Sequence, residues 1–195
     1  MAFPSNSHRL DFLPIEDGGS LEIAYEGPPL DLQTLGVLHL NLQDIVDHVA
    51  FAVLRDEELI GPYGQRRRSS APFRRAYDGR IVRAQPTKIE IGSLYEQIAF
   101  FVPAVLADPD VRSVLQNLAA NIVWAIGSSR FARWSNRAES SPNQSPSPRY
   151  PRIEVGPNVR TIVMTLAENG GGTVKFRSRG PNGQSSEVVI TANGH

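Results

Sequence analysis

The stretch from Asp31 to Leu59 carries the strongest helix signal in this chain and constrains the fold more than any other feature. Its apolar side chains recur at alternating steps of three and four, at Leu35, Leu38, Leu42, Ile45, Val49 and Ala52. That spacing places them on one face of a helix, with Asp31 as a suitable N-cap. An amphipathic helix of this kind must bury its apolar face, so we expect a layered fold built against it.

The rest of the chain predicts strands and further helices in a definite order. Runs that alternate or are continuously apolar predict strands over residues 21–25, 80–85, 87–91 and 94–102, with a helix as the alternative for the last of them. Asp108-Pro109-Asp110 begins a second amphipathic helix, which ends at Gly127. Further along, residues 157–168 predict a short helix, with a strand as the alternative, and residues 173–178 and 187–191 predict a hairpin.

This order predicts an α+β fold. We expect a mainly antiparallel sheet covered by two long amphipathic helices, with a small C-terminal helix–hairpin unit after a flexible linker. The chain divides into a flexible N-terminal arm (1–19), an α+β core (20–127), a Ser/Pro/Arg-rich linker (128–152) and a C-terminal helix plus β-hairpin unit (153–195). A unit as small as the last one is marginal alone, so we expect it to dock on the core.

Composition limits the compartment and the chemistry. The 195 residues are 41% hydrophobic, which is enough for a core. The absence of cysteine excludes disulfides, thiolate zinc sites and cysteine nucleophiles, and it fits a reducing cytoplasm. Residues 1–14 lack the pattern of a signal peptide, and Pro103 interrupts the most apolar run, residues 98–106. We therefore expect a cytoplasmic protein with no membrane partner.

Charge is unevenly distributed, although the formal net charge is zero. Residues 1–60 hold eleven acidic residues and two arginines, whereas residues 61–160 hold fifteen bases and seven acidic residues. In two basic segments, 66–77 and 130–137, arginines are interleaved with aromatic residues, as in surfaces that bind single-stranded nucleic acid. The candidate contacts for an anion or nucleic acid are Arg66, Arg67, Arg68, Arg74, Arg75, Arg130, Arg133, Trp134 and Arg137. Alternatively, these arginines pair with acidic residues of the same chain or of a partner protein.

Few residues have the spacing that catalysis or metal binding requires. Asp44 and Asp47 lie about one helical turn apart, but no third acidic or histidine ligand accompanies them. His39 and His48 lie nine residues apart and therefore point to nearly opposite sides of the helix. The glycines at 170–172 follow a predicted helix and precede a strand, which indicates a turn and not a phosphate loop. We predict no catalytic residue, no metal site and no cofactor, and we expect the protein not to be an enzyme.

The outward side of the 31–59 helix is the best candidate for a contact surface. Leu40 and Phe51 lie opposite the main apolar stripe, with Asp44 and Asp47 between them. Large apolar residues around acids on the wet face indicate a protein contact, although two isolated exposed hydrophobes are the alternative. We expect a non-enzymatic accessory protein that self-associates, as a homodimer, and contacts another protein. The alternatives are nucleic-acid binding through the two arginine segments and, third, an enzyme of unknown class.

Overall fold

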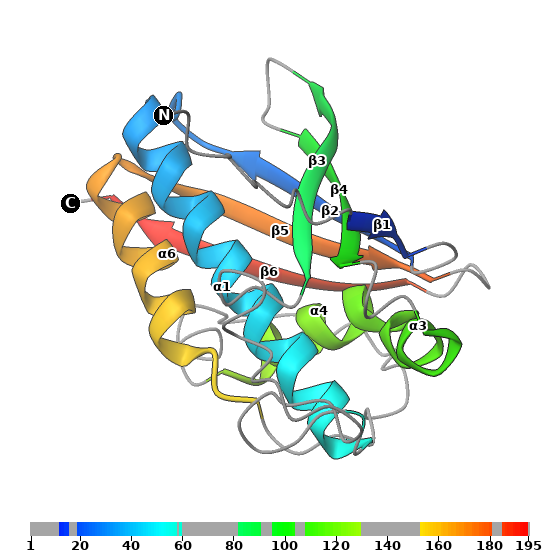
Figure 1. Ribbon diagram of the computed structural model, residues 1–195. Coiled ribbons are helices and arrows are strands. Elements are labelled where there is room, and N and C mark those ends of the chain that lie inside the picture. The colour runs from blue at the N-terminus through cyan, green and yellow to red at the C-terminus, as the bar shows by residue number, and fades with distance from the viewer. Residues whose placement is uncertain are drawn as a thin grey trace, which may run out of the picture.

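In the computed structural model, the described residues form an α+β fold with one antiparallel sheet (Figure 1). They are residues 12–15, 19–57, 59, 82–90, 95–103, 108–129, 153–180 and 185–194. The strands are β1 (Phe12–Pro14), β2 (Ser20–Glu26), β3 (Arg83–Glu90), β4 (Tyr95–Pro103), β5 (Gly171–Arg179) and β6 (Ser185–Asn193). The helices are α1 (Leu32–Asp56), α3 (Pro109–Leu115), α4 (Leu118–Ser128) and α6 (Gly156–Glu168). The predicted α+β class with a mainly antiparallel sheet is confirmed.

The sheet is organised around β4, which has neighbours on both of its edges. β3 pairs with one edge of β4, and β1 and β2 pair with successive parts of the other edge. β2 then pairs with β5, and β5 pairs with β6, so every described pairing is antiparallel. Three strands of the described sheet have a neighbour on one edge alone: the short β1, β3 and β6. Of these, β3 and β6 lie on opposite sides of the sheet in Figure 1.

One face of the sheet forms the core together with the helices. Alternate residues of the strands are buried on this face, including Leu21, Ile98, Phe176 and Ile190. α1 and α6 run beside each other over this face, and α4 packs against β5 and β6 (Figure 1). The apolar face of the strands and the apolar faces of the helices are thus buried against each other.

α1 begins where its sequence predicts. Asp31 accepts a hydrogen bond from the backbone amide of Thr34 at 2.6 Å, which makes it the N-cap. Nine residues of this 25-residue helix are buried, and it packs against α3, α4 and α6. By length and mean hydropathy, α1 is the one described helix that could cross a membrane, but here its apolar stripe lies inside the folded chain.

The opposite face of the sheet carries charged side chains in cross-strand pairs. The pairs, with N–O distances of 2.6–2.7 Å, are Glu22–Arg179, Glu26–Lys175 and Glu187–Arg177. They join β2, β5 and β6, so side chains reinforce the backbone ladder that connects these strands. Because most of these groups are open to solvent, each exposed pair contributes less than about 1 kcal/mol to the free energy of folding.

Three local predictions differ from the structure. The second long helix is divided into α3 and α4 at Gln116 and Asn117, so α1 is the one long helix among the described residues. Within the segment expected to be a loose N-terminal arm, β1 pairs with the end of β4. β3 runs through Pro86 with a shift of register before Lys88, which an edge strand tolerates because the missing amide of proline is not needed there.

The segment before the glycine cluster is a helix, as predicted, and not the alternative strand. In α6, Val159, Ile162 and Leu166 are buried at the spacing of one helix face. Gly170 follows with a φ of +93°, and its amide donates to the carbonyl of Ala167 at 3.2 Å. The glycine cluster therefore ends a helix and opens β5, as the sequence indicates.

Candidate functional site

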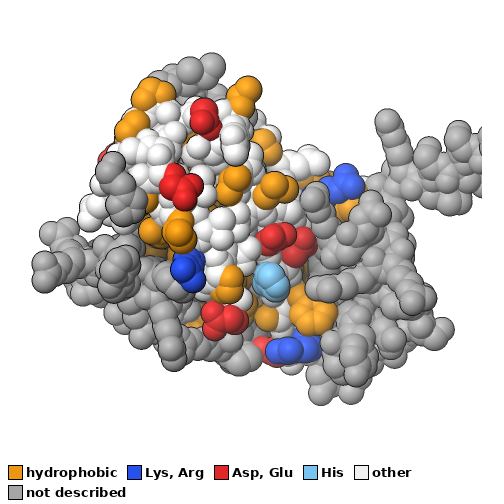
Figure 2. Space-filling view, turned by 90° about the vertical axis from the view of Figure 1, so that its left-hand side faces the viewer, with side chains coloured by type: hydrophobic (Ala, Val, Ile, Leu, Met, Phe, Trp, Pro, Cys, Tyr) orange, Lys and Arg blue, Asp and Glu red, His pale blue; other side chains and the backbone are white. Residues whose placement is uncertain are grey.

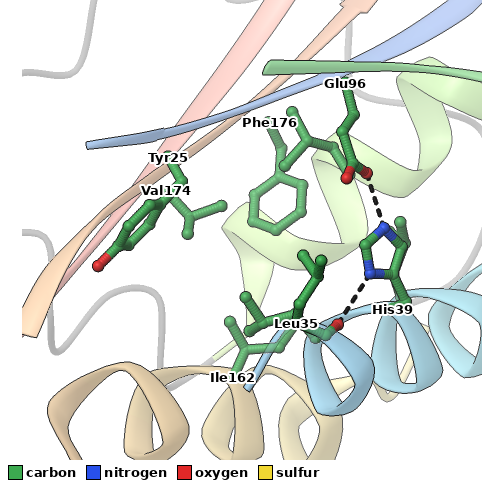
Figure 3. A pocket seen from close by; sticks show the side chains of 10 residues that line it. Tyr25, Leu35, His39, Glu96, Ile162, Val174 and Phe176 are labelled. Atoms are coloured by element: carbon green, nitrogen blue, oxygen red, sulfur yellow. Dashed lines mark hydrogen bonds and ion pairs between the residues drawn. The ribbon is translucent and has the colours of Figure 1, made fainter. Parts of the chain in front are cut away.

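α1, α6 and the sheet line a small, partly open pocket beside the core (Figure 3). Its volume is about 30 Å³, which is room for about two water molecules. Four of the lining side chains come from α1, one comes from α6, and the others come from β2, β4 and β5. They are Ile23, Tyr25, Leu35, Leu38, His39, Leu42, Glu96, Ile162, Val174 and Phe176. All but three of them are apolar, so the cavity is mainly a gap in the core with one polar side.

His39 and Glu96 form that polar side. The Nε2 atom of His39 lies 2.7 Å from Oε2 of Glu96, and the Nδ1 atom lies 2.8 Å from the carbonyl oxygen of Leu35 (Figure 3). The Glu96 side chain is 3% exposed and the His39 side chain 35% exposed. The pair therefore joins β4 to α1 at the margin of the core.

The Leu35 carbonyl and the Glu96 carboxylate determine the protonation state of the His39 imidazole. A carbonyl oxygen and a carboxylate both accept hydrogen bonds, so both ring nitrogens donate only when the imidazole is protonated. The hydrogen bond to Glu96 raises the pKa of His39 above its ordinary value of 6.5; burial lowers this pKa, and the bond to Leu35 and the charge of Glu96 raise it further. The charged imidazolium is thus the form that this site favours.

This geometry fits a structural pair better than a catalytic one. A general base needs a ring nitrogen that is free to take a proton from a substrate. Here each ring nitrogen already faces an acceptor of the same chain, and the neighbouring cavity is too small for a substrate or an organic cofactor. What the arrangement can do is hold α1 on the sheet through a charge-assisted hydrogen bond.

The predicted contact residues on α1 differ in their surroundings. Leu40 is 62% exposed, and Asp44 is also exposed. Phe51 is partly buried and packs against the core cluster. Asp47 lies beside β3, where its carboxylate accepts hydrogen bonds from Gln43 and from the backbone of the residue before β3. The structure therefore leaves Leu40 and Asp44 facing outward and turns the other two toward the protein.

Gln43 and Asp47 attach α1 to the beginning of β3. The Gln43 amide donates to the carbonyl of Val82 at 2.8 Å and accepts from the amide of Ala84 at 3.0 Å. Asp47 accepts from the amide of Val82 at 3.4 Å. Two helix side chains thus satisfy backbone groups that a neighbouring strand would otherwise bind.

The outer side of α1 near Leu40 carries little charge. The run from Leu32 to Gln43 contains no Asp, Glu, Lys or Arg. Leu32 is 88% exposed, and a Cβ atom added at Gly36 would meet nothing within 4 Å. Figure 2 shows one side of the molecule, where hydrophobic side chains are scattered among acidic ones. The first half of α1 therefore exposes Leu32, Gly36 and Leu40 at helical spacing, and the exposed Asp44 follows one turn later.

The other predicted site residues lie outside the described part of the chain. These are the arginine segments 66–77 and 130–137, with every candidate nucleic-acid contact in them. Among the residues that are described, no group of three His, Asp or Glu side chains is placed to hold a metal ion. Comparisons with protein-family models, curated proteins and solved structures found no match to this chain. The site must therefore be interpreted from its own residues.

Sequence reasoning missed the pairing of His39 with Glu96. One signal was present, because Glu96 has the same parity in β4 as Ile98, Phe100 and Val102, and these positions point into the core. A carboxylate on the inner face of a strand needs a buried partner. The partner could not be identified from spacing, since His39 lies 57 residues away in the chain.

Proposed function

We propose that this protein is a non-enzymatic accessory protein that self-associates. The outer side of α1 is the surface through which it binds another protein. The single observation that carries the proposal is Leu40, a leucine that is 62% exposed within residues 32–43 of α1, which contain no Asp, Glu, Lys or Arg. Burying a leucine side chain at an interface contributes about 1.5–3 kcal/mol. A partner that covers Leu40 would gain this contribution.

The binding surface on α1 is smaller than the sequence alone indicates, and it lies nearer the N-terminal end of the helix. It consists of Leu32, Gly36, Leu40 and Asp44, which we call the α1 strip. Gly36 would let a partner approach the helix backbone closely, because nothing projects at that position. Asp44 adds a negative charge at one end, so a suitable partner presents an apolar pocket with a basic residue at its rim.

Two further features belong to the same proposal. α6 with the paired strands β5 and β6 acts as the C-terminal unit that the sequence predicts after residue 152. The protein works in the cytoplasm, whose reducing conditions would break disulfides; a chain without cysteine does not depend on them.

Affinity purification of a tagged chain from its native cells tests the proposal. Leu40→Asp is compared with Met164→Asp, which makes the same type of change at a residue that is 49% exposed on α6. We expect a protein that co-purifies with the parent and with the Met164 variant, and that is lost with the Leu40 variant. Equal recovery with all three chains, at equal thermal stability, contradicts binding at the α1 strip.

Nucleic-acid binding through the arginine segments is the second candidate. It is motivated by the interleaved arginine and aromatic residues of segments 66–77 and 130–137. Titration with labelled single-stranded RNA at several salt concentrations tests it, since phosphate contacts weaken steeply with salt. Replacing Arg66, Arg67 and Arg68 by Ala should then weaken binding and flatten the salt dependence. No binding at low salt rejects this function.

A further inference from the structure

The two long edge strands of the described sheet, β3 and β6, differ in how well their outer edges are protected from pairing with another strand. An edge strand exposes a row of unpaired amides and carbonyls, which can pair with a strand of another molecule. At β3 the row is blocked: Gln43 and Asp47 occupy its first groups, Pro86 has no amide, and the register shifts before the exposed Lys88. Charge, proline, a bulge and a covering side chain are the devices that prevent edge pairing.

Among the described residues, β6 lacks a proline, a bulge and a covering side chain, and its one charged residue, Glu187, is paired with Arg177 of β5. It pairs with β5 over nine consecutive residues without a shift of register, and it contains no proline, lysine or arginine. Among the described residues, no strand pairs with its other edge (Figure 1). Every second residue of β6 therefore points its amide and carbonyl away from β5, in a straight row as long as the strand.

We infer that β6 pairs antiparallel with β6 of a second copy of this chain, so that the two sheets continue into each other. This inference specifies the self-association within the proposed function. It concerns a surface different from the α1 strip, and the two contacts can therefore succeed or fail separately.

The sequence of β6 matches itself in this arrangement. A two-fold axis through Val189 places Glu187 opposite Thr191 of the second copy and Ser185 opposite Asn193, all on the face away from the helices. On the helix-covered face, Val188 lies opposite Ile190, which are β-branched residues suited to cross-strand packing. The polar ends of one β6 thus face the polar ends of the other, and the β-branched centres face each other, as a self-complementary contact requires.

Charge disfavours one of the alternative registers. Moving the axis to residue 187 would place the two Glu187 carboxylates directly opposite each other, which is unfavourable. With the axis at Val189, the two carboxylates are four residues apart along the seam, and each keeps Arg177 of its own chain at 2.7 Å. The symmetric register also uses all nine residues of the strand, whereas any shift leaves part of the edge unpaired.

Single cysteines test the pairing directly, because the chain has none of its own. In the proposed register the two residues at position 189 have Cα atoms about 4.5–5.5 Å apart, within the range of a disulfide. Val189→Cys should therefore give a covalent dimer on mild oxidation. Glu187→Cys alone should not, because its two copies lie about 13 Å apart along the strand. A mixture of Glu187→Cys and Thr191→Cys chains should cross-link again.

Sedimentation of variants without cysteine completes the experiment. The parent should be a dimer, Val189→Lys a folded monomer, and Gln85→Lys on the exposed edge of β3 a dimer like the parent. A monomeric parent, or cross-linking that does not depend on the position of the cysteine, overturns the inference. Leu40→Asp should leave the dimer intact. If the dimer is absent but Leu40-dependent protein binding persists, the seam at β6 is refuted and the binding function of α1 stands.

Discussion

Replacing His39 by Gln should make the protein less stable in a way that depends on pH. Glutamine removes the charge of the imidazolium but keeps a side chain that donates a hydrogen bond. The pKa of His39 in the folded protein lies above 6.5, mainly because of the hydrogen bond to Glu96. The charged histidine therefore contributes its full stabilisation below pH 6.5, and this contribution is lost as the pH rises through the folded-state pKa.

The structure sets the size of this effect. A hydrogen bond to a charged group contributes about 1.5–3 kcal/mol, and the lower end applies here because the His39 side chain is 35% exposed. We expect the substitution to lower the free energy of unfolding by about 1.5 kcal/mol near pH 6 and by less than about half of that near pH 9. Above its pKa, the neutral ring donates to Glu96 or to Leu35 but not to both.

Urea unfolding at the two pH values measures the difference, with His48→Gln as the matched control. His48 is exposed on the same helix, so its replacement should change stability by less than about 0.5 kcal/mol. An NMR titration of the His39 ring gives the pKa itself. The reasoning is refuted if His39 titrates at or below 6.5, or if the His39 variant is destabilised equally at both pH values.

Three further substitutions test the fold around the site. Gln43→Ala removes the bonds to Val82 and Ala84 and should cost about 1–3 kcal/mol in urea unfolding, with faster hydrogen exchange of the Ala84 amide; unchanged exchange would show that Gln43 does not hold β3. Tyr25→Phe removes the buried hydroxyl that donates to the Gly171 carbonyl at 3.1 Å, and calorimetry should record a loss of about 1 kcal/mol; an unchanged melting temperature contradicts it. Gly171→Ala should lower the free energy of unfolding by more than about 2 kcal/mol in urea unfolding. The reason is that φ at Gly171 is +90° and the added methyl group would lie 2.5 Å from the backbone nitrogen of Gly194. A neutral effect would exclude this strain.

Local signals predicted the helices and strands better than the contacts between them. α1 and its cap at Asp31 could be predicted because the apolar repeat and the capping residue lie next to each other in the chain. The break between α3 and α4 could not, since Leu115 and Leu118 continue the three–four spacing across it. A helix can turn at such a point without disturbing the pattern of its buried residues.

The candidate site shows the same limit. Periodicity identified Leu40 and Asp44 as outward-facing, and both are exposed. It also placed Phe51 and Asp47 outward, but the core covers part of Phe51 and β3 engages Asp47. The period of a helix tells which residues share a face, whereas the position of β3 beside that face depends on pairing between distant segments.

Site-specific photo-cross-linking at position 40 tests the central claim most directly. Two variants are made, one with a benzophenone amino acid in place of Leu40 and one with it in place of Met164. Each variant is expressed and irradiated in its native cells. The account predicts a discrete adduct with a second protein at position 40 and none at position 164, since Met164 lies on α6, outside both the α1 strip and the β6 edge. No protein adduct at position 40, or the same adducts at both positions, would contradict it.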